Sequence, residues 1–174
     1  MKTKTTDRFA GKIVMITLAA LMTVTCDRMK DDPYYVGTWE YKDIVYVGEF
    51  TYNTTRTIGL AETTFEEIYV MQRDNSSTIA TILGLKGSLL ISGSEMTFKL
   101  NAVGECVKDG QNQCTGAVEW FAKGTATYNT YIQYLRETIM GEFEASEDYL
   151  WLVRDSNNDG DTDDLGEDIY FDRI

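Results

Sequence analysis

Short runs in which apolar and polar residues alternate are the feature that most constrains the fold of this chain. Met96, Phe98 and Leu100 alternate with polar neighbours, and residues 139–145 repeat the pattern. A period of two places the apolar set on one face of a β-strand. Gly, Asn, Asp and Ser separate these runs, so the sequence predicts an antiparallel all-β fold.

These runs divide the chain from Tyr35 onward into about eight to ten strands joined by short connections. The expected strands span residues 38–45, 54–60, 63–72, 78–85, 87–92, 95–101, 116–122, 139–145, 149–154 and 168–174. Residues 131–138 fit either a helical turn or a strand. So many antiparallel strands in one domain must close into a barrel or pair as a sandwich, because open edges invite aggregation.

Composition narrows the functions open to such a domain. The 174 residues suit a single domain, and a formal charge of −12 disfavours binding to the phosphate backbone of nucleic acids. The chain contains no histidine, which excludes Ser-His-Asp and Cys-His catalysis and histidine-ligated zinc. Glu66 and Glu67 point to opposite faces of a strand, and Glu142 and Glu144 are expected in solvent, so neither pair makes a glycosidase dyad. No enzyme is predicted.

The N-terminal residues resemble a secretory signal peptide. A charged start precedes an apolar run over residues 13–24, which is too short to span a bilayer. The run ends in Leu21-Met-Thr-Val-Thr-Cys26, which resembles the lipobox of bacterial lipoproteins. The resemblance implies removal of residues 1–25 and a lipid anchor on Cys26, in the bacterial cell envelope on its periplasmic or surface face. Ordinary cleavage nearby is the alternative, and residues 26–34 are expected to form a charged tether.

Cys106 and Cys114 remain as a pair once Cys26 is assigned to the anchor. They flank Asp109-Gly110, a tight-turn dipeptide, so both are expected near the base of one hairpin loop and within disulfide distance. Export to an oxidising compartment permits that bond. A reduced pair is the alternative, and metal binding by two thiols alone is disfavoured.

The two ends of the expected domain carry a further signal. Gly37 and Trp39 form a Gly-x-Trp motif after a Pro-Tyr-Tyr segment, and Arg173 lies in the last expected strand. These features resemble the lipocalin superfamily, whose first strand carries Gly-x-Trp and whose last strand supplies a basic residue that lies across the tryptophan. The resemblance implies a lipocalin-like antiparallel barrel over residues 35–174, with Arg173 stacked on Trp39. Trp39 is expected in the core in either case.

The segment before the last expected strand is rich in carboxylates and has no cation. Oxygen-bearing residues at every second position before Gly160 resemble the first half of an EF-hand loop and imply Ca²⁺ binding. The second half departs from that pattern, because the twelfth position falls on Gly166 and the flanks read as strands. The expected ligands are Asp155, Asn157, Asp159, Asp161, Asp163, Asp164 and Glu167. A solvated acidic turn without a metal is the alternative.

Two functions are compatible with these features. A barrel of about eight strands either holds one small apolar ligand or is filled by its own side chains. The first case predicts an envelope ligand-binding module, and the second a structural or partner-binding surface lipoprotein without a small ligand. An interior void above about 300 Å³ would favour the ligand-binding module.

Overall fold

The computed structural model describes residues 33–155, 160–162 and 167–174. Pro33–Ile174 form one compact unit. Cys26 and most of the expected tether lie outside the described residues, so the lipid anchor stays a prediction. Within the described part of the chain, no helix is both long and apolar enough to cross a membrane.

Antiparallel strands form nearly all of this unit, which confirms the all-β prediction. The strands are β1 (Gly37–Val47), β2 (Phe50–Leu60), β3 (Thr64–Arg73), β4 (Ile79–Ser92), β5 (Glu95–Lys108), β6 (Cys114–Ala122), β7 (Thr138–Ala145), β8 (Tyr149–Arg154) and β9 (Asp168–Arg173). The short helix α2 (Ala126–Tyr131) follows β6. Thr125 caps that helix, because its side chain accepts a hydrogen bond from the backbone N–H of Tyr128.

The sheet closes on itself as an antiparallel barrel. Consecutive strands pair from β1 to β5, and the ring continues through β7, β8 and β9 back to β1. The closing register joins Trp39 to Arg173 and Glu40 to Asp172. One edge of β5 is shared, since Glu95–Lys99 pair with β7 whereas Ala102–Lys108 pair with β6. β6 belongs to the closed barrel as well, since its Cys114 is in register with Ile79 of β4.

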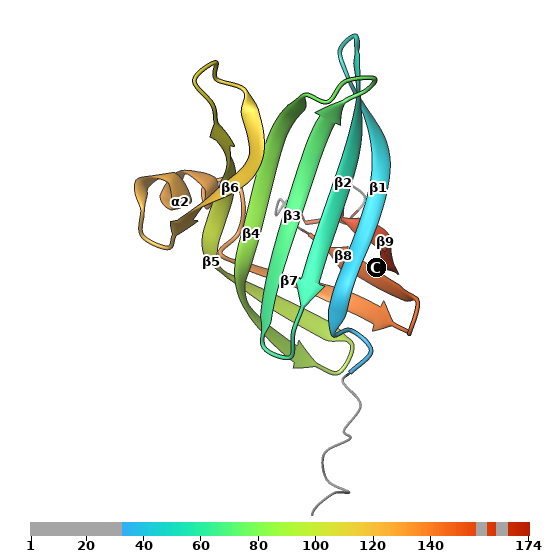
Figure 1. Ribbon diagram of the computed structural model, residues 1–174. Helices are drawn as coiled ribbons and strands as arrows, with labels where there is room; N and C mark the ends of the chain where they lie inside the picture. The colour runs from blue at the N-terminus through green and yellow to red at the C-terminus, as the bar shows by residue number, and fades with distance from the viewer. Residues whose placement is uncertain (1–32, 156–159, 163–166) are drawn as a thin grey trace, which may run out of the picture. The chain divides into compact units, whose positions relative to one another are not determined.

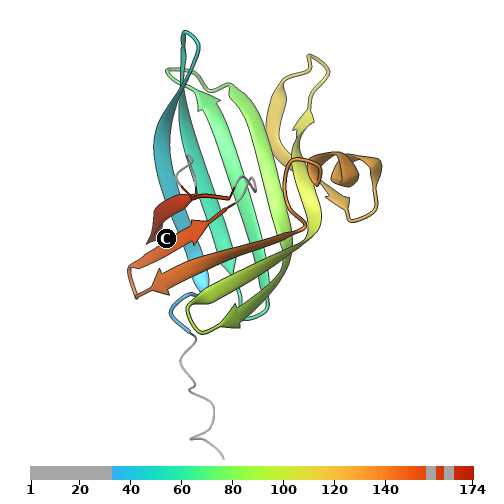
Figure 2. The ribbon, with the colours of Figure 1, turned by 180° about the vertical axis from the view of Figure 1, so that it is seen from behind.

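The barrel has two parts that differ in how many strands surround them. We call the part ringed by β7–β9 the closed half, and the part in which β1–β6 continue past those strands the extended half. Figure 1 and Figure 2 show β1–β4 running well beyond the shorter β7–β9. On β1 the division falls after Glu40, the last residue in register with β9.

The core of the unit fills the closed half. Its fully buried members include Trp39, Ile58, Met96, Phe98, Leu100, Ile139, Leu150, Leu152 and Phe171. They come from six strands of the ring and from alternating positions, as the period of two predicted. Phe65 packs edge-on against Phe98, with ring centroids 5.0 Å apart. The closed half is therefore an ordinary packed interior rather than a cup.

Two expectations about strand boundaries were wrong. Residues 78–85 and 87–92 form the single strand β4, which runs through Lys86 and Gly87 without a break in its pairing with β3. A Cβ atom at Gly87 would lie 1.8 Å from the backbone oxygen of Lys99, so the strand passes this point only with glycine. The strand expected over 95–101 extends to Lys108. A register shift near residues 100–102 moves its inward positions by one residue, and the alternation then continues to the end of the strand.

Candidate functional site

Inward-facing residues change from apolar to polar where the closed half meets the extended half. On β1, Trp39 is followed on the same face by Tyr41 and Asp43. On β2 the series read from the same end runs Ile58, Arg56, Thr54, and on β3 it runs Phe65, Glu67, Tyr69. Register pairs Tyr41 with Arg56, and Arg56 with Tyr69, while Glu67 lies opposite Ile58 at the edge of the core. The polar residues therefore form a layer that adjoins the core.

Glu67 lies at the centre of this layer and bridges two arginines. Its carboxylate accepts hydrogen bonds from Nη2 of Arg154 at 2.6 and 2.8 Å, and it is also paired with the Nε–H of Arg56. Glu67 and Arg154 are each only 2% exposed, and the Arg154 guanidinium lies over the Phe98 ring, 5.2 Å from its centroid. A buried carboxylate is tolerated only with such partners, since an unpaired charge there would be very costly.

The electrostatics of the network follow from burial and charge acting in opposite directions. Burial alone would raise the pKa of Glu67, but the charges of Arg154 and Arg56 and their hydrogen bonds outweigh it and lower the pKa to about 2. Burial lowers the pKa of Arg154, against the opposing effect of Glu67. Glu67 is therefore charged at neutral pH.

Two phenols and a carboxylate continue the polar layer into the extended half. Asp43 lies close enough to the Tyr41 hydroxyl to influence its pKa, and Thr54 lies close enough to that of Tyr69 to do the same. Thr54 also donates to the backbone oxygen of Asp43 at 3.1 Å. Burial, followed by the Asp43 charge, raises the pKa of Tyr41, and burial also raises that of Tyr69. Tyr41, Asp43 and Tyr69 are only half-buried, in contrast to the core below them.

The helix α2 and the connection after it border the extended half at β5 and β6. The buried Tyr128 hydroxyl donates to the backbone oxygen of Leu100 at 2.8 Å, which fixes the helix to the barrel. Tyr131 lies near Glu105, which raises the pKa of the Tyr131 hydroxyl after burial does, and Glu105 is an inward-facing residue in register with Leu83. Polar groups with half-buried side chains therefore face this end of the interior from several sides.

The residues expected from the lipocalin resemblance do come together. The Arg173 guanidinium lies 4.9 Å from the centroid of the Trp39 ring, within the range of a cation–π contact. It also donates to the backbone oxygens of Val36 at 2.7 Å and Glu147 at 3.3 Å. Trp39 is fully buried, and its indole N–H donates to the oxygen of Tyr35. This contact joins the first and last strands.

Gly37 is required at the same seam for two reasons. Its φ of +153° lies in a region that residues with a side chain rarely adopt. A Cβ atom here would also lie 2.9 Å from Nη2 of Arg173. The backbone conformation thus explains the glycine of the Gly-x-Trp pattern, and the Arg173 side chain packs directly against it.

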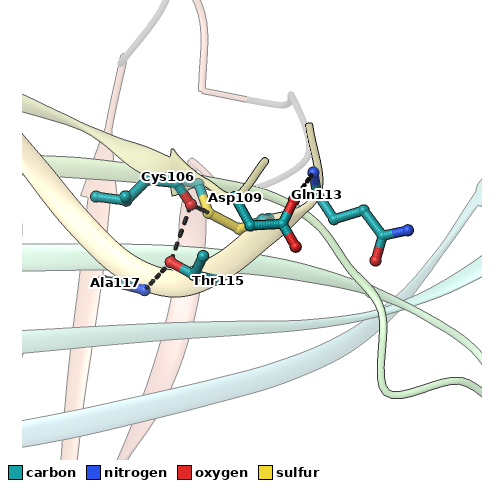
Figure 3. Close-up of a disulfide and its surroundings, with 7 residues drawn as sticks. Cys106, Asp109, Gln113, Thr115 and Ala117 are labelled. Carbon is teal, nitrogen blue, oxygen red and sulfur yellow. Dashed lines mark hydrogen bonds between the residues drawn. A yellow bond between two sulfur atoms is a disulfide. The ribbon is translucent and has the colours of Figure 1, made fainter. Parts of the chain in front are cut away.

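Cys106 and Cys114 form the expected disulfide at the base of the β5–β6 hairpin, with Cα atoms 5.6 Å apart (Figure 3). The Asp109 carboxylate accepts hydrogen bonds from the backbone N–H groups of Gln111 and Gln113, each at 2.8 Å. The left-handed residue of the loop is Asn112, with φ of 60°, so the special conformation is not at Gly110 as the Asp-Gly dipeptide suggested.

The expected calcium ligands are only partly visible. Asn157, Asp159, Asp163 and Asp164 lie outside the described residues. Asp155 accepts a hydrogen bond from the backbone N–H of Gly160 at 3.2 Å, and Asp161 is exposed. Glu167 is buried at 3% exposure beside Arg154, an unexpected position for a ligand completing a surface loop. Residues 33–155, 160–162 and 167–174 contain no cluster of three metal-ligating side chains, and calcium binding stays a prediction.

A surface groove of about 630 Å³ lies on the outer side of the barrel. Its lining includes the outward-facing Thr38, Gly59, Glu66 and Lys86, whose strand neighbours point into the core. Because the groove is outside the barrel, it does not bear on the interior void that would favour a ligand cup.

No family model and no curated protein sequence matches the chain. Glu66 is exposed and Glu67 is buried, so the two side chains lie on opposite faces of β3, as the strand pattern predicts. Glu142 and Glu144 are exposed, also as predicted. The network itself was not predicted. The signal was present, because Arg56, Glu67 and Arg154 occupy core-facing positions of their strands.

Proposed function

We propose that this protein is a lipocalin-like binding protein that holds a small ligand in the extended half of its barrel. The observation that carries the proposal is the polar layer around Glu67 on top of a filled apolar core. The half-buried Tyr41, Asp43 and Tyr69 offer hydrogen-bonding groups next to apolar side chains such as Leu83. A ligand with an apolar body and a polar end fits such a lining.

The cellular setting is part of the same proposal. The apolar run before Cys26 and its lipobox-like ending support export and a lipid anchor in the bacterial cell envelope. The disulfide between Cys106 and Cys114 agrees with an oxidising compartment. Labelling with radioactive palmitate should mark the wild-type chain and leave Cys26→Ala unlabelled, whereas label retained in that variant would contradict the anchor.

The ligand-binding role is tested with a neutral fluorescent probe, N-phenyl-1-naphthylamine, and a pair of variants. Leu83→Trp adds volume on an inward, half-buried position, and Ile44→Trp makes a similar addition on a side chain that is 51% exposed. We expect saturable binding by the wild type and by Ile44→Trp, and at least about a tenfold weaker affinity in Leu83→Trp.

The alternative role is a filled barrel that serves as a structural or partner-binding envelope protein. It predicts no saturable binding of the probe, or binding that Leu83→Trp and Ile44→Trp weaken equally. Native mass spectrometry of the folded protein purified from its own host adds a second readout, because a retained small molecule would be seen only if the interior is occupied.

A further inference from the structure

The outer face of β7, β8 and β9 carries an aromatic cluster of one exposed and two half-buried rings, with carboxylates around it. Its outward positions on β8 and β9 include Tyr149, Trp151 and Tyr170, and Tyr170 is 63% exposed. Trp151 stacks on Tyr170 with ring centroids 5.9 Å apart and planes 24° from parallel, and Tyr149 lies 6.5 Å from Tyr170. We call these three rings and their flanking acids the aromatic–acidic face.

Two of the three rings are hydrogen-bonded to carboxylates. The Trp151 indole N–H donates to Oδ1 of Asp168 at 2.7 Å, and the Tyr149 hydroxyl donates to Glu144. Register also places Glu144 opposite Trp151 and Asp172 opposite Tyr149. The carboxylates on the face are the exposed Glu142, Glu144, Asp168 and Asp172.

No cation balances these charges on the face itself. Every residue of β7, β8 and β9 is described, and their outward positions hold no Lys or Arg. Arg154 and Arg173 belong to the inward-facing series of β8 and β9, where they contact Glu67 and Trp39. The aromatic–acidic face thus combines negative charge with the negative faces of three π systems.

We propose that the aromatic–acidic face is a docking site for a basic peptide segment of a partner protein. Lys and Arg side chains are attracted both to the rings, through cation–π contacts, and to carboxylates that keep acceptor positions free after bonding the ring edges. Clusters of exposed Trp and Tyr are typical of protein interfaces and uncommon on surfaces without a partner. This proposal does not depend on a ligand inside the barrel.

A peptide titration followed by amide chemical shifts tests the proposal on the intact chain. The probes are penta-arginine, penta-lysine and a neutral peptide of the same length. We expect the basic peptides to shift signals of β7–β9 selectively, with affinity that falls as salt rises, and the neutral peptide to shift none.

Matched variants separate this site from general attraction to an acidic protein. Tyr170→Ala removes an exposed ring, and Tyr46→Ala removes one that is 75% exposed on β1. Glu142→Gln with Asp172→Asn lowers the charge of the face, and Glu49→Gln with Glu62→Gln makes the same change in the β1–β2 and β2–β3 turns. We expect at least about a threefold loss of affinity in the variants of the face and no more than a small change in their controls.

Three outcomes would overturn the proposal. One is an equal loss of affinity in the face variants and in their controls, and another is the absence of any localised shift. The third is binding of a neutral oligosaccharide such as cellopentaose at this face without binding of the basic peptides, which would assign the rings to sugar stacking. Because the charge variants retain all three rings, they keep the test decisive even if Tyr170→Ala disturbs the strands.

Discussion

The closed and extended halves of the barrel share strands β1 to β5 but differ in what they enclose. In the closed half, Trp39, Ile58 and Phe65 point into an apolar core that eight strands surround. Two residues further along the same strands, Tyr41, Arg56 and Glu67 face the same interior. Packing therefore stabilises one half, whereas paired charges and hydrogen bonds organise the other.

The difference teaches where this molecule has freedom to bind. Core positions of the closed half are fully occupied by side chains that touch one another. Polar groups of the extended half retain partial exposure and unused hydrogen-bonding capacity, because each hydroxyl and carboxylate can accept more than one bond. The layer around Glu67 is the boundary between the filled apolar core and the partly exposed polar interior.

The largest expected effect on stability comes from removing one charge of the Glu67 layer. Arg154→Met removes a buried partner of Glu67 and should lower the free energy of unfolding by about 3–5 kcal/mol. Arg136→Met, at an exposed arginine, should change it by no more than about 0.5 kcal/mol. Urea denaturation of both variants measures the difference.

A double variant sharpens the same comparison. Glu67→Leu with Arg154→Met removes both buried charges, so it should be more stable than Arg154→Met alone. If the losses of unfolding free energy in the two single variants simply add up to the loss in the double variant, Glu67 and Arg154 are not coupled. The layer is then not held together by their ion pair.

Acid should weaken the ion pairs of Glu67 before it affects the apolar core of the closed half. The pKa of Glu67 falls from an ordinary 4.5 to about 2, so its contribution is complete above pH 4.5 and is lost as the pH falls toward 2. The loss should be on the order of 3 kcal/mol. Unfolding curves between pH 6 and 2 should show a steeper decline for the wild type than for Glu67→Gln, and parallel curves would contradict this assignment.

In the extended half, the disulfide should contribute less than the ionic boundary. Cys106→Ser with Cys114→Ser should lower the free energy of unfolding by about 2–3 kcal/mol, mainly by freeing the unfolded chain. Cys26→Ser is the matched control and should leave that energy unchanged. Mass spectrometry of unreduced, alkylated protein checks the bond directly, since two blocked thiols at these positions would exclude it.

The smallest effect is expected at the seam of the closed half. Arg173→Ala removes the cation over Trp39 and should lower the free energy of unfolding by about 0.5–2 kcal/mol. Lys99→Ala on the outer surface is a control for loss of a positive charge. Equal stability of Arg173→Ala and the wild type in thermal unfolding would show that the ring contact does not hold the seam.

Alternation was enough to predict the strands of the closed half, because there each inward position is filled by an apolar residue. It failed at two neighbouring points. Gly87 looked like a strand boundary although β4 continues through it, and the extra residue Asn101 in β5 moves the inward positions of that strand from Leu100 to Val103. A register shift depends on how two strands fit together, and a single strand's residues do not record that fit.

The candidate site was harder to predict for a related reason. Gly37, Trp39 and Arg173 form a pattern at the two ends of the domain, so their contact could be anticipated from the resemblance. Glu67 and Arg154 are 87 residues apart, and each alone is merely a charged residue at a core-facing position. Only the closed ring shows that these positions meet.

The seam between β1 and β9 also determines the order in which the molecule can be assembled. The bond from Arg173 to Val36 spans 137 residues, whereas β1, β2, β3 and β4 follow one another as hairpins. Local hairpins close small loops and form early, and the seam must wait for the largest loop in the chain. Until β9 joins it, one edge of β1 lacks a neighbouring strand and is open to pairing with another chain. The short strand β9 therefore determines when an aggregation-prone sheet becomes a closed molecule.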